Sequence, residues 1–76
     1  MNNKIRTVVA FIDNGKKVRT KVLFYTIPNM AVGQIMCFDH PNMAACLSGK
    51  ITDIGHAIYL DGDARPVTYV DVEVDH

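Results

Sequence analysis

The sequence has few of the features that mark secreted or membrane proteins. It has only 2 cysteines in 76 residues, and without a visible export signal these favour a reducing compartment and free thiols. No stretch approaches the ~18 consecutive apolar residues of a membrane span. The first residues alternate between polar and apolar and do not resemble a signal peptide. We therefore expect a cytoplasmic protein that does not associate with a membrane.

The motifs of common catalytic and cofactor sites are also missing. No phosphate loop, dinucleotide fingerprint or EF-hand loop occurs. Cys37 and Cys46 are candidate thiols, but a cysteine in an apolar stretch such as residues 35–38 is typically an inert core residue. The acidic residues at 71, 73 and 75 share one strand face, which is more typical of a solvated surface than of an acid–base pair. We expect no catalytic residue, no cofactor and no enzymatic activity.

Two cysteines and two histidines leave a zinc site open as an alternative. Cys37 and His40 form a C-x₂-H step, and Cys46 and His56 follow at longer intervals. The four residue types suit tetrahedral zinc, but structural sites usually combine two closely spaced pairs. We expect no metal, with a zinc-stapled domain as the alternative.

Short β-strand patterns separated by turn signals make up most of the chain. The apolar content of 49% is enough for a core, and 76 residues fit one domain, residues 1–76. Strands are expected over residues 4–12, 18–27, 34–38, 50–54, 57–60 and 67–74. Asn14-Gly15 predicts a tight hairpin turn between the first two, and Gly55 a bend or bulge between 50–54 and 57–60. Residues 43–47 are expected to form a single helical turn or a loop.

This order predicts an all-β fold, a small five- to six-stranded SH3-like barrel with at most one helical turn. Alternation places Thr7, Val9 and Phe11 on one face of the first strand and Val70, Val72 and Val74 inward in the last. The apolar residues 23–27 indicate that this end of the second strand is covered on both sides.

Charge is unevenly distributed although the net charge is zero. Residues 1–25 contain six basic residues and one acidic residue, and residues 39–76 contain two basic and seven acidic residues. One interpretation is that the two halves pair across neighbouring strands. The other is a dipolar surface with a basic face for nucleic acid and an acidic face that limits non-specific binding.

Basic residues interleaved with an aromatic residue form the remaining candidate site. Arg19, Lys21 and Tyr25 project from one face of the second strand, and Lys16 and Lys17 lie at its start. Tyrosine can stack on bases, and lysine and arginine release counterions from phosphates. The alternative is a hairpin whose lysines keep its edge soluble. Tyr59 and Tyr69 are expected as core-edge tyrosines or as further binding platforms.

Five segments resemble the N-terminal DNA-binding domain of the primosomal replication-restart helicase. They are residues 8–10, 24–28, 32–38, 49–54 and 67–75. The resemblance implies an SH3-like module that captures the 3′ end of a DNA strand at a fork, with Tyr25 and the loop before Val32 near the pocket. It also implies a stand-alone relative without a helicase domain, as in small phage or mobile-element proteins. Phe24 stands where the family has an aspartate.

Two functional hypotheses follow. The first is a non-enzymatic module that binds DNA or another nucleic acid through Lys16, Lys17, Arg19, Lys21 and Tyr25. The second is a protein-interaction module or an inhibitor of a host protein, because Met30, Met36 and Met43 suit adaptable contact surfaces. Exposed strand edges on so small a barrel also make a homodimer plausible.

Overall fold

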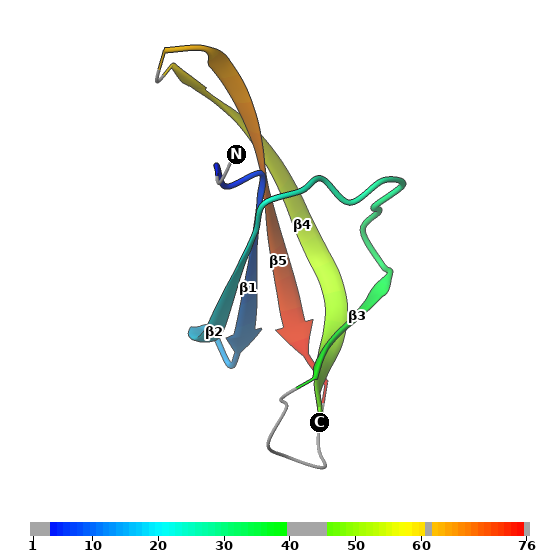
Figure 1. Ribbon diagram of the computed structural model, residues 1–76. Helices are drawn as coiled ribbons and strands as arrows, with labels where there is room; N and C mark the ends of the chain where they lie inside the picture. The colour runs from blue at the N-terminus through cyan, green and yellow to red at the C-terminus, as the bar shows by residue number, and fades with distance from the viewer. Residues whose placement is uncertain (1–3, 40–45, 61, 76) are drawn as a thin grey trace.

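The computed structural model describes residues 4–39, 46–60 and 62–75, which form five β-strands and no helix. The strands are β1 (Thr7–Asp13), β2 (Lys16–Leu23), β3 (Ile35–Asp39), β4 (Cys46–Leu60) and β5 (Ala64–Val74). They form one sheet in the order β2-β1-β5-β4-β3 (Figure 1). The predicted all-β fold is confirmed, and the sheet curls into a half-barrel compatible with a small SH3-like barrel. Within the described ranges, no helix is long and apolar enough to cross a membrane.

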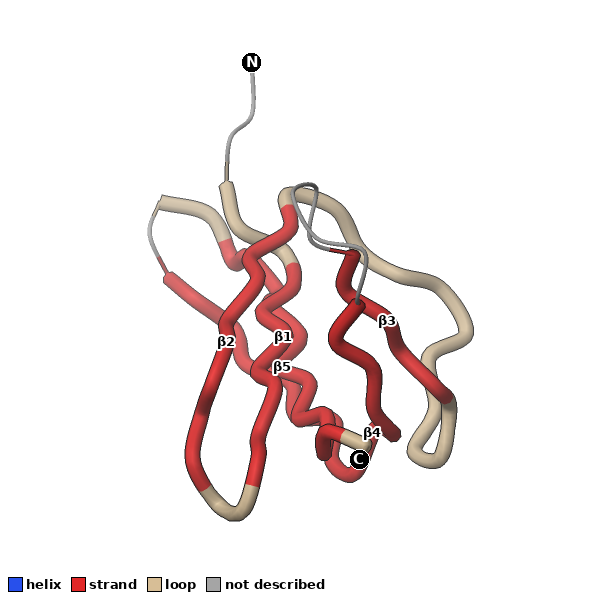
Figure 2. The backbone as a smooth tube through the Cα atoms, turned by 90° about the horizontal axis from the view of Figure 1, so that it is seen from below, coloured by secondary structure: helices blue, strands red, loops and turns tan. Residues whose placement is uncertain are grey.

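The first and last strands lie side by side at the centre of the sheet. β1 pairs with β5 in parallel, from Thr7 opposite Thr68 to Ile12 opposite Glu73. All other neighbours are antiparallel. β2 and β3 are therefore the two edges, and the sheet curls between them (Figure 2).

The core lies on one face of this curled sheet, which we call the concave face. It is formed by Val9, Phe11, Ile51, Val70 and Val72, none of which is more than 3% exposed. The pairing of the strands brings these side chains together on one face, because Phe11 is opposite Val72 and Val72 is opposite Ile51. The predicted inward faces of the first and last strands are confirmed, with Thr7 fully buried and Val74 packed against the core. Side chains at alternate positions point to the other, convex face.

The predicted hairpin turn between β1 and β2 is also confirmed. Asn14 and Gly15 have φ angles of 51° and 80°. Both lie in the left-handed region that the twist-matched two-residue turn requires. The turn brings the basic strand β2 against β1 and leaves the outer side of β2 unpaired.

The fourth strand differs from the prediction. Residues 50–54 and 57–60 do not form two strands, because β4 runs unbroken for 15 residues. β5 pairs with it as far as Leu60 opposite Ala64, so the ladder continues through Gly55 opposite Tyr69. The irregularity lies instead between Ile51 and Asp53. Of the possible helical turn at 43–47, residues 43–45 lie outside the described residues, and the last two positions already belong to β4.

The second strand ends earlier than predicted, at Leu23 instead of residue 27. β1 begins at Thr7, so no ladder partner remains beyond this point. Phe24 is 55% exposed and Tyr25 61% exposed, so the expectation that this end is covered on both sides is wrong. The chain then crosses to β3 as a loop, and Met30 of that loop packs against the core.

Candidate functional site

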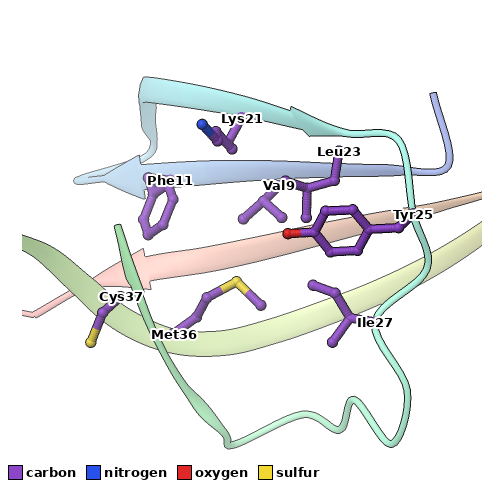
Figure 3. A pocket seen from close by; sticks show the side chains of 8 residues that line it. All are labelled: Val9, Phe11, Lys21, Leu23, Tyr25, Ile27, Met36 and Cys37. Carbon is purple, nitrogen blue, oxygen red and sulfur yellow. The ribbon is translucent and has the colours of Figure 1, made fainter. Parts of the chain in front are cut away.

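A groove lies on the concave face between the two edge strands. It has a volume of about 240 Å³. Its lining comes from β1, β2, β3 and the connecting loop: Val9, Phe11, Lys21, Leu23, Tyr25, Ile27, Met36 and Cys37. In Figure 3, Met36 lies across the groove from Val9, the Tyr25 ring reaches toward the space between them, and Lys21 stands on β2 at the margin. We call this the Tyr25 groove. It is an apolar floor bordered by one aromatic ring and one cation.

Hydrogen bonds hold the backbone at Tyr25 in place, while its side chain is exposed to solvent. The buried Thr7 hydroxyl donates a hydrogen bond to the Tyr25 carbonyl at 2.8 Å. The Arg6 N–H donates to the Leu23 carbonyl, also at 2.8 Å. These bonds fix the point where the chain leaves β2, while the Tyr25 ring remains largely exposed. An exposed ring on a backbone held in place, beside an apolar groove, is suited to stacking on a planar ligand.

Two cations of β2 share the concave face with this ring. Lys21 is opposite Val9 and Arg19 is opposite Phe11. Both of these β1 residues belong to the core, and residues directly opposite in a sheet point to the same side. The register therefore places Arg19 and Lys21 on the concave face. Tyr25 does not project from β2 as predicted, because it lies beyond the end of that strand, but it lines the groove together with Lys21.

The two lysines at the start of β2 are placed differently. Lys16 is opposite Asp13 beside the turn. Lys17 is opposite Ile12, and a register shift separates this pair from Arg19. Since Ile12 alternates with Phe11, Lys17 lies on the convex side. Lys16 and Lys17 thus belong to the hairpin tip, outside the lining of the Tyr25 groove.

The carboxylates of β5 lie on the opposite face from Arg19 and Lys21. Asp71 is opposite both Ala10 and Asp53, and Glu73 is opposite Lys50. They alternate with the buried Val70 and Val72, so they point to the convex face. β1 separates β2 from β5. Arg19 and Lys21 therefore do not face the acidic β5 residues, whereas Lys17 shares the convex face with them.

A second groove continues along the concave face. It has a volume of about 380 Å³ and is lined by Thr26, Ile27, Asn29, Met30, Ile54, His56 and Thr68. Ile27 borders both grooves. The two grooves are therefore neighbours beside the loop that joins β2 to β3.

Two of the four residues of the zinc alternative, Cys37 and His56, lie far apart along the β3–β4 pair. Cys37 is opposite Ser48 across the β3–β4 pair, whereas His56 is eight residues further along β4. At about 3.3 Å per residue these positions are about 26 Å apart along the strand, too far for one ion. His40 and the Cys46 side chain lie outside what the structure describes. Among the described residues, no three His, Cys, Asp or Glu side chains are grouped for a metal.

Cys37 also differs from its expected place in the core. Its thiol is free and exposed, and it borders the Tyr25 groove. Successive residues of β3 point to opposite faces of the sheet, and only the concave face carries the core. Met36, the neighbour with opposite orientation, takes the place against the core.

Tyr59 and Tyr69 lie away from both grooves and are engaged with each other. Their hydroxyl groups form a hydrogen bond, and the Arg65 guanidinium lies 5.3 Å from the centre of the Tyr59 ring. The hydrogen bond with Tyr59, aided by desolvation, raises the pKa of Tyr69 above its usual 10.0, and the Arg65 charge opposes this. Tyr59 and Tyr69 thus act as a brace on the β4–β5 hairpin, and Tyr25 is the tyrosine that borders a groove.

The apolar part of the Tyr25 groove was missed by the sequence analysis. Val9 and Phe11 have the same alternation as Thr7, but their exposure to a groove depends on the curl of the sheet. Ile27 and Met36 come from segments on opposite sides of the loop, and no local pattern relates them. The spacing of Lys21, Leu23 and Tyr25 at every second residue was the one sequence pattern that indicated part of this lining.

Comparison of the chain with protein-family models, curated proteins and solved structures finds no match.

Proposed function

We propose that this protein is a non-enzymatic module that binds single-stranded nucleic acid, in particular DNA, along its concave face. The observation that carries the proposal is the position of Tyr25, an exposed ring with a fixed backbone, beside an apolar groove and on the same face as Arg19 and Lys21. Single-strand binding sites combine stacking platforms with a track of cations.

Each part of the face has a role in this proposal. The Tyr25 ring stacks on one base, and the apolar floor takes the edge of that base. Arg19 and Lys21, which both lie on β2 to one side of Tyr25, contact the phosphates of the strand that leads away from this base. With a volume of about 240 Å³, the groove is smaller than the ~300–1,000 Å³ typical of small-molecule sites and suits one planar group. Asp71 and Glu73 on the convex face repel phosphates and favour one binding orientation.

The resemblance to the primosomal helicase domain is the reason for proposing DNA over RNA as the ligand and a replication fork as the place of binding. The aspartate of that family is replaced by Phe24, which is 55% exposed and outside the lining of both grooves. We therefore propose binding without preference for a 3′ end. Oligonucleotides labelled at either end, and forks with either strand recessed, should bind with equal affinity.

The first test is fluorescence anisotropy with a labelled 12-nucleotide strand at low salt, where phosphate-driven affinity is greatest. Tyr25→Ala should weaken binding about 5- to 160-fold, because base stacking contributes about 1–3 kcal/mol. Phe24→Ala is the matched control, since it removes an exposed aromatic ring next in sequence and should leave affinity unchanged. Absence of binding at low salt would overturn the proposal.

The second test uses salt dependence. Lys21→Ala should reduce the slope of log K against log[salt] by about 0.7, the contribution of one single-strand phosphate contact. Lys50→Ala changes the net charge equally, but on the convex face opposite Glu73, and should leave the slope unchanged. Equal effects of the two substitutions would mean that only net charge matters and that the concave face is not the site.

A further inference from the structure

The outer side of β2 offers unpaired backbone groups for another strand. β2 ends the sheet order, so within the described ranges one of its sides has no neighbouring strand. The Leu23 carbonyl points toward β1, where it accepts from the Arg6 N–H. Successive residues of a strand turn their N–H and C=O groups to alternate sides. The backbone N–H and C=O groups of Arg19 and Lys21 therefore bond to β1, and those of Thr20 and Val22 point outward.

The side chains along this edge specify what kind of strand would fit. Arg19 and Lys21 lie on the concave face, while Thr20 and Val22 lie on the convex face, with Val22 42% exposed. β2 contains no acidic residue. An added strand therefore meets cations on one side and a β-branched surface on the other. Its best complement alternates acidic with β-branched residues, because opposite charges and β-branched pairs stabilise cross-strand neighbours.

A second copy of this chain does not meet that requirement. Antiparallel pairing of two β2 strands would bring lysine and arginine side chains opposite one another, and like charges directly opposite are destabilising. The chain's own alternating acidic strand is β5, of sequence ARPVTYVDVEV. It is already paired on both sides, by β1 and β4.

We propose that the β2 edge binds an extended acidic segment of a partner protein as a sixth strand, by β-augmentation. The added strand would place carboxylates beside Arg19 and Lys21 and extend over the Tyr25 groove. This proposal does not depend on nucleic-acid binding. It shares two cations with that function, so the two ligands should compete.

The test uses a labelled eight-residue peptide of alternating valine and aspartate, followed by anisotropy. A peptide of the same composition with its four aspartates in one block is the control for simple charge attraction. The alternating peptide should bind at least tenfold more tightly. Equal affinity of the two peptides would overturn the proposal.

Backbone pairing is tested by two further changes. Peptides N-methylated on alternate amides form two sets, and one set should lose at least tenfold in affinity while the other keeps it, because only one set of N–H groups faces β2. In the protein, Val22→Pro removes an outward N–H and leaves the bonds to β1, as edge strands tolerate. Peptide affinity should fall about tenfold, while Val22→Thr, which keeps the N–H, should bind as wild type.

The same variants separate this proposal from the previous one. Val22→Pro should bind single-stranded DNA normally, since phosphates and bases contact side chains. Equal losses from the two N-methylated sets, or unchanged peptide affinity of a folded Val22→Pro, would exclude strand addition whatever the result with DNA.

Discussion

Gly49 is the position at which β4 and β5 approach most closely among the described glycines. A Cβ at this position would lie 2.1 Å from the Glu73 carbonyl oxygen and 2.8 Å from the Val72 Cγ1 atom. Backbone cannot give way as a flexible side chain does, so Gly49→Ala would push β5 away by more than 1 Å. β5 carries Val70 and Val72, and the displacement would loosen the core.

The cost follows from the size of this overlap. Overpacking a tight site costs about 1–3 kcal/mol, and an overlap with backbone belongs at the upper end. Alanine also lowers the entropy of the unfolded chain, which returns about 0.5–1 kcal/mol. We expect a net loss of about 2 kcal/mol. With an unfolding entropy of about 2.1 cal/mol/K per residue, this lowers the Tm of a 76-residue domain by about 12 °C.

Gly55→Ala is the matched control on the same strand. No atom lies within 4 Å of a Cβ placed there, so this substitution should be neutral or slightly stabilising. Thermal unfolding followed by far-UV circular dichroism, with urea titration as a second measurement, compares the two variants. If Gly49→Ala were as stable as Gly55→Ala, the close β4–β5 contact and the register that produces it would be wrong.

Three other predictions concern the core, the brace and the turn. Phe11 is 1% exposed, so Phe11→Ala should cost about 3–5 kcal/mol in urea unfolding, and a loss below 1 kcal/mol would mean that the core lies elsewhere. Tyr59→Phe should return the raised pKa of Tyr69 toward 10, as measured by NMR titration of labelled tyrosine. Because folding raises the pKa of Tyr69, the contribution of this group to folding stability is complete below pH 10 and is lost as pH rises through the pKa of the folded protein. If Tyr59→Phe left the titration of Tyr69 unaltered, the hydrogen bond between the two hydroxyl groups would not be the cause of the raised pKa. Gly15→Ala should cost about 1–2 kcal/mol because of its positive φ, and an unchanged Tm would contradict the turn geometry.

Local patterns predicted the local parts of this fold. Asn14-Gly15 marked the hairpin turn, and the alternation of Val9 with Phe11 and of Val70 with Val72 gave the inward faces, because turn chemistry and period-two alternation depend on adjacent residues. The parallel contact of β1 with β5 joins residues about 60 positions apart and has no local signal. The unbroken β4 results from its antiparallel pairing with β5, which extends along it past Gly55.

The candidate site was predictable only where it depends on local sequence patterns. The shared face of Arg19 and Lys21 follows from the alternation of side chains along β2 and could be read from the sequence, whereas Tyr25 lies beyond the end of that strand. The groove beside them could not, because it depends on how far the sheet curls and on where the chain leaves β2. The apolar run at 23–27 suggested a covered strand. Because β1 begins only at Thr7, no strand pairs with the chain beyond Leu23, and Tyr25 is exposed.

The most direct test of the proposed function is to map binding onto the two faces of the sheet. A short single strand of DNA is titrated into ¹⁵N-labelled protein, and amide chemical shifts are followed. We predict that the changes centre on Arg19, Lys21, Tyr25 and Ile27, with little change at Asp53 and Asp71 on the convex face. Changes centred on the convex face, or none at low salt, would contradict the account.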